Sequence, residues 1–170
     1  MAMASTGDDH MSLFPTWLTE LFPISSWTNE TYGNLHRIFV NDFQDFPPSF
    51  QGATVWHYRR LDGDKEEVFW HITSMEDKKA GERLPDLRRC ERIRWIRCII
   101  ENSEQPEVRV WDYRESNGSI HTYLWLHSCD FVVILKNHSK YGRFLLTAFC
   151  VHESTKRNLN SKFEKRIKTE

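Results

Sequence analysis

Hydrophobic and polar residues follow a helical period in the first part of the chain and a strand period later. In residues 29–45 apolar side chains recur every three or four positions, which predicts an amphipathic helix that two consecutive prolines end. A shorter helix is expected in residues 13–24, with a serine cap before it and a proline near its end. A third helix, rich in arginine, is expected in residues 85–101, where Pro85 suits the first turn and Asp86 the positive end.

Strand-like runs form two groups, and the first group comes before the arginine-rich helix. Residues 54–60 and 67–73 are rich in β-branched and aromatic side chains, and residues 61–64 between them are typical of a turn. The polar residues 74–81 are expected to form a loop. This part of the chain therefore predicts two strands joined by a turn.

The second group of strand-like runs predicts the main sheet. Its first hairpin has the turn sequence Ser116-Asn117-Gly118. The four expected strands are residues 107–114, 119–126, 131–136 and 144–151. A charged tail follows, and it is compatible with a helix. We therefore predict an α+β fold in which N-terminal helices are followed by a four-stranded antiparallel sheet with a helix packed on one face.

Length and composition indicate one globular domain. The chain has 170 residues, of which 39% are hydrophobic and 14% aromatic, which is enough to bury a core. Residues 1–10 look like a leader added for expression, so the domain is expected to span residues 11–170. The net charge of -1 indicates no particular partner, but basic residues outnumber acidic ones after Asp130. Such a basic C-terminal tail is compatible with a polyanion.

Other sequence features argue against several classes of protein. The chain has no apolar run of the about 20 residues that cross a bilayer, and no secretory signal is visible. Its four cysteines form no C-x-x-C pair, which argues against a zinc ribbon, and we interpret them as buried thiols. We therefore expect a cytoplasmic protein with no membrane association, no metal and no other cofactor.

A histidine in the predicted strand 67–73 is a candidate for proton transfer. If the valine, tryptophan and isoleucine of this run face the core, His71 and Thr73 share the opposite face. Imidazole titrates near neutral pH, so it can take a proton from a ribose 2′-hydroxyl or give one to the leaving 5′-oxygen. The alternative is a histidine that one backbone hydrogen bond satisfies.

Arginines crowd the predicted helix that follows. Arg89 and Arg92 are three positions apart and can point the same way, and Arg94 belongs to the same run. Guanidinium groups bind phosphate bidentately and stabilise the charge that builds on a pentacovalent phosphate. The alternative is ion pairing with nearby carboxylates, but residues 82–101 contain six arginines and only four carboxylates.

The predicted sheet offers further polar groups. His121 and Tyr123 alternate with other residues on one strand face, which suits base stacking and proton transfer or, equally well, a second packed face. Thr147 interrupts an apolar strand, where its hydroxyl either bonds a neighbour or holds a phosphate oxygen. Lys136 ends its strand, either as a phosphate contact or as a polar terminus.

Three segments that contain these candidates resemble a known superfamily. They are Phe69-Trp70-His71-Ile72-Thr73, Arg83-x-Pro85-Asp86-Leu87-x-Arg89-x-x-Arg92-Ile93-x-Trp95, and Leu145-Leu146-Thr147-Ala148. The chain resembles the BECR nuclease superfamily, which unites barnase, EndoU, colicin-type tRNase and RelE domains, and it looks closest to the branches found in phages and mobile elements. The resemblance covers roughly residues 34–165 and extends to the layout of helices followed by a four-stranded antiparallel sheet.

The resemblance implies a toxin-like endoribonuclease that cleaves RNA without a metal ion. In such a reaction the 2′-oxygen attacks the adjacent phosphate and leaves a 2′,3′-cyclic phosphate. The resemblance gives His71 the acid–base role and makes Arg89 and Arg92 a phosphate clamp. It makes Thr147 a hydrogen-bond donor in the transition state, and it makes Tyr123 a candidate for the second proton transfer.

The chain departs from the superfamily at the second proton-transfer group. No second histidine follows His71 closely, and no Glu/His pair with barnase-like spacing is evident, so either Tyr123 or His121 is expected to serve. Substrate-binding roles are expected for Thr73, Arg94, His121 and Lys136. The expected partners are tRNA or mRNA, and an antitoxin or immunity protein. The alternative hypothesis is a non-catalytic RNA- or protein-binding regulatory domain of a phage or mobile element.

Overall fold

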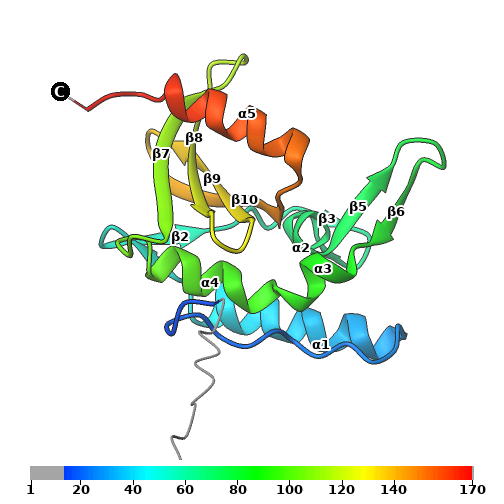
Figure 1. Ribbon diagram of the computed structural model, residues 1–170. Helices are drawn as coiled ribbons and strands as arrows, with labels where there is room; N and C mark the ends of the chain where they lie inside the picture. The colour runs from blue at the N-terminus through cyan, green and yellow to red at the C-terminus, as the bar shows by residue number, and fades with distance from the viewer. Residues whose placement is uncertain (1–13, 170) are drawn as a thin grey trace, which may run out of the picture.

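A six-stranded sheet lies at the centre of the protein (Figure 1). The computed structural model describes residues 14–169, so the expected leader at residues 1–10 lies outside the described part. The strand order is β1-β2-β10-β9-β8-β7. The strands are β1 (Ser49–Phe50), β2 (Ala53–Trp56), β7 (Val108–Arg114), β8 (Ile120–Leu126), β9 (Phe131–His138) and β10 (Gly142–Cys150). Strands β7 to β10 form the predicted antiparallel meander.

The α+β class is confirmed, but the predicted four-stranded antiparallel sheet is only part of the sheet. Strand β10 pairs with β2 in the parallel direction, with Phe144 opposite Trp56. Strand β1 then pairs with β2 in the antiparallel direction. These two added strands are short, and β10 lies far along the chain from them. No local sequence pattern therefore indicates the pairing, and the strand predicted at residues 54–60 ends at Trp56.

Helices cover both sides of the sheet (Figure 1). On one side lie α1 (Asn29–Phe39), its π-helical continuation η1 (Val40–Asp45), α3 (Leu87–Glu91) and α4 (Ile93–Glu101), and on the other lies α5 (Glu153–Glu164). The helix predicted at residues 29–45 is confirmed, and Thr28 caps it by accepting a hydrogen bond from the Thr31 backbone N–H. The arginine-rich helix is present but breaks at Arg92. None of the helices in residues 14–169 has the length and hydropathy that a bilayer-spanning helix needs.

The two sides of the sheet have separate hydrophobic clusters. On the α4 side, Trp95 packs edge-on against Phe131 of β9 with ring centroids 5.8 Å apart, and Ile96 is fully buried beside them. On the α5 side, Trp111 and Leu159 belong to a second, smaller cluster. Burial of each such side chain contributes about 1.5–3 kcal/mol, so both helix layers are held firmly on the sheet.

Residues 67–73, which the sequence predicts as a strand, form the helix α2 (Glu67–Thr73). Four of its side chains are buried, and they recur with helical spacing: Val68, Phe69, Ile72 and Thr73. The ring of Phe69 packs on that of Phe39 in α1 at 5.8 Å, and α2 lies against β10. The aromatic and β-branched residues favour a strand only weakly, and this packing overrides that preference.

Two more predictions about local structure are wrong. Residues 74–81 are not a plain loop, because β5 (Ser74–Asp77) pairs with β6 (Glu82–Pro85) in a β-hairpin that protrudes from the body of the protein (Figure 1). A smaller hairpin is formed by β3 (Leu61–Asp62) and β4 (Lys65–Glu66). Within residues 14–24 no helix forms. The backbone N–H of Phe22 donates to the carbonyl of Glu91, and the indole N–H of Trp95 donates to the carbonyl of Thr19. These bonds to α3 and α4 replace the bonds that a helix would make within the segment.

Candidate active site

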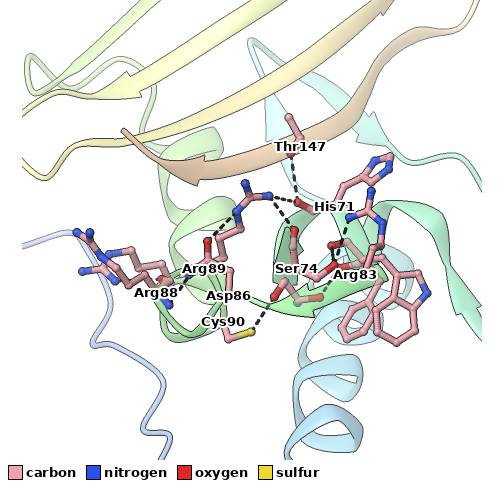
Figure 2. Close-up of polar contacts among 12 residues, drawn as sticks. His71, Ser74, Arg83, Asp86, Arg88, Arg89, Cys90 and Thr147 are labelled. Carbon is pink, nitrogen blue, oxygen red and sulfur yellow. Dashed lines mark hydrogen bonds and ion pairs between the residues drawn. The ribbon is translucent and has the colours of Figure 1, made fainter. Parts of the chain in front are cut away.

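The end of helix α2 places His71 beside strand β10. Its backbone carbonyl accepts hydrogen bonds from Arg89 Nη1 at 2.8 Å and from Thr147 Oγ1 at 3.3 Å (Figure 2). Arg89 Nη1 also donates to the carbonyl of Ser74 at 3.1 Å. These bonds satisfy carbonyls that the end of a short helix leaves without partners within the helix. They fix the backbone from which the imidazole projects, and the His71 side chain remains 30% exposed.

Arg89 is in turn held by the start of α3. One carboxylate oxygen of Asp86 accepts hydrogen bonds from the backbone N–H groups of Arg88 and Arg89, and the other pairs with Arg89 Nε at 3.2 Å. Burial lowers the pKa of Arg89, and Asp86 opposes that effect. The sequence predicts Arg89 and Thr147 as phosphate ligands. The structure brings both beside His71, but their polar atoms face its backbone, so in this geometry they position the histidine.

Glu67 is a functional candidate that the sequence analysis missed. It lies one helical turn before His71, and its Oε1 is 4.0 Å from His71 Nε2. In an extended strand, residues four positions apart are separated by about 13 Å, so the predicted strand placed the two side chains out of reach. If residues 67–73 are read as a helix, the spacing of four positions places Glu67 and His71 on the same side and reveals the pair.

Burial lowers the pKa of His71 below its usual value of 6.5, and the charge of Arg83 lowers it further. Glu67 and the Leu146 backbone act in the opposite direction, and Arg89 adds to the lowering. Because the lowering effects prevail, the pKa of His71 lies below 6.5 and the neutral imidazole is the main form at pH 7. A neutral, half-buried imidazole is available to accept a proton.

Two adjoining recesses open beside His71, and both are also lined by Leu146. The first, of about 340 Å³, is called here the Lys136 recess; its other lining residues are Tyr58, Arg60, Glu67, Val68, Lys136 and Leu145. The second, of about 400 Å³, is called the Arg83 recess; its other lining residues are Ser74, Met75, Glu76, Arg83, Arg89 and Thr147. Cationic groups therefore lie on both sides of the imidazole, which suits an anionic ligand such as a phosphodiester.

Arg83 is a second residue that the sequence analysis left without a role. It lies on β6, it is exposed, and its Nη1 donates to Ser74 Oγ at 3.3 Å (Figure 2). By contrast with Arg89, its contacts leave most of the guanidinium open to a ligand. Arg83 is the first residue of a segment that carries the superfamily resemblance, and this could have marked it as a candidate. Only the hairpin of β5 and β6 shows that Arg83 lines the same recess as His71.

Thr73 does not take part in this site. It is completely buried, and its hydroxyl donates to the backbone carbonyl of Phe69 at 2.8 Å. The expectation that Thr73 binds substrate on the same face as His71 is therefore wrong. The reason is the helical conformation, which turns neighbours two positions apart to different sides.

Arg92 and Arg94 also lie away from His71. Arg92 ends α3, stacks over the ring of Trp95 at 4.9 Å and donates to the carbonyl of Arg88. Arg94 lies over the ring of Phe22 at 5.3 Å and lines a different recess. The expected clamp of Arg89 with Arg92 is thus not formed, because the helix breaks between α3 and α4 and Arg92 turns to the indole.

Tyr123 and His121 belong to another polar cluster, under α5. The hydroxyl of Tyr123 donates to Glu115 and accepts from Lys162 Nζ at 2.6 Å, and burial raises the pKa of this phenol strongly. His121 Nδ1 is 3.4 Å from Glu115 Oε1. Tyr123 is only 3% exposed, so the structure does not place it for proton transfer at His71. His121 lies one strand away from the Lys136 recess, opposite Lys136 in the sheet register.

Over the described range 14–169 no group of three or more His, Cys, Asp or Glu side chains is arranged to hold a metal ion. No protein-family model matches the chain, and neither the curated proteins nor the solved structures contain a match to it. The fold and the site therefore define the protein as an α+β chain with a mixed sheet and a histidine–carboxylate pair in a cationic recess.

Proposed function

We propose that the protein is a metal-independent endoribonuclease in which His71 takes the proton of a ribose 2′-hydroxyl. The observation that carries this proposal is an imidazole with a carboxylate 4.0 Å away, beside two recesses that each contain basic side chains. Burial, which lowers the pKa of His71, agrees with it. A base near neutrality, beside cations that attract a phosphate, meets the two needs of 2′-hydroxyl attack.

The reaction follows from the groups that line the recesses. The neutral imidazole of His71 removes the 2′ proton, and the 2′-oxygen attacks the adjacent phosphorus. The bond from phosphorus to the 5′-oxygen breaks, and the ammonium of Lys136 donates the proton that the leaving oxygen needs. The products are a 2′,3′-cyclic phosphate and a free 5′-hydroxyl. Glu67, whose other carboxylate oxygen pairs with Arg60 Nε at 3.3 Å, lies close enough to stabilise the imidazolium that forms. Arg83 balances the charge on the pentacovalent phosphate.

The substrate in this proposal is a cellular RNA such as tRNA or mRNA, and the protein acts as a cytoplasmic toxin of a phage or mobile element. The resemblance to BECR nucleases and the basic recess support this part of the proposal. Such a toxin requires an antitoxin or immunity protein in the cell that makes it. Induced expression in bacteria should therefore stop growth, and His71→Ala should relieve the arrest at an equal protein level.

The direct test incubates the purified protein with 5′-labelled RNA in excess EDTA. We expect discrete fragments that end in a cyclic phosphate, and no cleavage of DNA or 2′-O-methyl RNA of the same sequence. His71→Ala should abolish cleavage, and Glu67→Gln should lower it by about 10²–10⁴-fold, the range typical of groups that assist proton transfer. His127→Ala, an exposed histidine outside both recesses, is the matched control and should cleave like the parent.

Two outcomes would overturn the proposal. Cleavage that persists in His71→Ala would show that another group is the base. If no fragments form over a wide range of protein concentrations although the protein binds RNA, the alternative hypothesis of a non-catalytic regulatory domain is favoured.

A further inference from the structure

A row of aromatic rings lies next to the Lys136 recess. Tyr58 stacks on Phe144 with ring centroids 4.5 Å apart and an interplanar angle of 17°. Phe144 is edge-on to His138 at 6.4 Å, and His138 lies 4.8 Å from the ring of Tyr141. We call these four residues the aromatic shelf. Tyr58 and His71 line the same recess, so the aromatic shelf is adjacent to the proposed reaction centre.

The sheet register places Phe144 of the shelf on one face with Lys136 and Trp56. Phe144 of β10 is opposite Lys136 of β9 on one side and opposite Trp56 of β2 on the other. Residues opposite each other in a sheet point to the same face, so these three side chains lie side by side. Lys136 therefore joins the shelf to the recess. Lys140, in the turn after β9, lies over the ring of Tyr141 at 5.2 Å.

Two rings of the shelf are exposed although they are large and aromatic: Tyr58 is 40% exposed and Tyr141 56%. Phe144 and His138 are half-buried, and Trp56, which neighbours the shelf, is 49% exposed. The helix α5 lies over the other part of this face of the sheet (Figure 1). There Trp111 and Tyr123 are buried in one cluster with Leu159 of α5. The protein therefore buries aromatic rings where α5 reaches and leaves those beside the active site open. An exposed aromatic cluster rimmed by cations is typical of a ligand surface.

The chemistry of this surface fits a nucleotide. Every base has a flat π-face that stacks on Tyr or Phe, and the neighbouring ammonium and guanidinium groups pair with backbone phosphates. A base inside a duplex has both of its faces covered, so only an unpaired base can use the shelf.

We propose that the aromatic shelf binds an unpaired nucleobase of the RNA next to the phosphate that is cleaved. This inference rests on the proposed function, because it takes the scissile phosphate to lie in the recess at His71. It makes the protein specific for single-stranded or looped RNA. The base stacks on the face of Tyr58 that Phe144 leaves open, and Lys136 bridges the base site and the phosphate site.

The test compares Tyr58→Leu with Tyr58→Phe, which keeps the ring. On a single-stranded oligonucleotide we expect Tyr58→Leu to lower kcat/KM by about 5- to 150-fold, the ratio that corresponds to one lost stacked base. Tyr58→Phe should stay close to the parent, and the parent should cleave the same sequence far more slowly inside a duplex. Phe46→Leu, an aromatic residue that is 64% exposed away from the shelf, is the matched control and should have no effect.

Binding separates this inference from the proposed reaction. In the His71→Ala background, which prevents turnover, fluorescence anisotropy of a labelled oligonucleotide should show that Tyr58→Leu weakens binding and Phe46→Leu does not. If the parent cleaves RNA and Tyr58→Leu changes neither cleavage nor binding, base binding at the shelf is refuted and the proposed cleavage reaction is not. If no RNA is cleaved but Tyr58→Leu still weakens binding of single-stranded RNA, the proposed cleavage reaction is refuted and base binding at the shelf is supported. Equal activity on duplex and single strand also overturns the shelf.

Discussion

Two arginines lie beside His71, and their contacts differ. Arg89 donates to the carbonyls of His71 and Ser74 and pairs with Asp86, whereas exposed Arg83 makes one hydrogen bond, at 3.3 Å, to the Ser74 hydroxyl. We predict that Arg89→Met destabilises the fold, and that Arg83→Met lowers cleavage while the fold keeps its stability. Methionine retains the length of the side chain and removes its charge and its donors.

The size of the effect follows from these contacts. A hydrogen bond from a charged group contributes about 1.5–3 kcal/mol when it is partly buried, and Arg89 makes two of them to backbone carbonyls. The His71 carbonyl keeps the bond from Thr147, which reduces the loss. We therefore expect Arg89→Met to lower the free energy of unfolding by about 3 kcal/mol, a sum taken at the low end of that range. Arg83→Met should stay within about 0.5 kcal/mol of the parent, as exposed substitutions usually do.

Urea unfolding followed by tryptophan fluorescence measures the difference, because Trp70 of α2 and buried Trp95 of α4 report on the surrounding packing. In thermal unfolding, Arg89→Met should lower Tm by about 6–12 °C, at about 2–4 °C for each kcal/mol in a chain of this size. Equal unfolding midpoints for the two variants would refute the reasoning, because they would show that Arg89 does not hold the end of α2.

The remaining predictions concern proton transfer and the polar cluster under α5. Because burial and Arg83 lower the pKa of His71, the acidic limb of kcat/KM should lie below pH 6.5. In pH–rate profiles Arg83→Met should move this limb to higher pH, since it removes a nearby cation, and Glu67→Gln should move it to lower pH; movement in the opposite directions would contradict the assigned charges. Tyr123→Phe should lower the free energy of unfolding by about 1–2 kcal/mol, because the phenol bonds to Glu115 and Lys162 are lost, and should leave kcat unchanged. A loss of kcat in that variant, with the fold intact, would restore the proton-transfer role that the sequence suggested for Tyr123.

Several features could be predicted from the sequence because local patterns determine them. The periodic apolar residues of 29–45 form α1 and η1, and Asp86 lies at the positive end of the arginine-rich helix as predicted. Asp86 is the N-cap of that helix, however, and Pro85, expected in its first turn, belongs to β6. The turn at Ser116-Asn117-Gly118 connects β7 to β8, and the charged tail contains α5. In each case the residues that decide the structure are neighbours along the chain. His71, Arg89, Thr147 and Lys136 could be named as candidates because the chemistry of each side chain is independent of the fold.

Only the tertiary structure decided how those candidates meet. The run at residues 67–73 has strand-forming side chains, but burial of Phe69 and Ile72 against α1 and the sheet makes it helical, and this conformation brings Glu67 to His71. The pairing of β2 with β10 places Trp56 beside Phe144 and so forms part of the face on which the aromatic shelf lies. Contacts between segments far apart in the sequence leave no local periodicity. They are selected by burial of apolar surface across the whole fold, which outweighs the weak preference of any single segment.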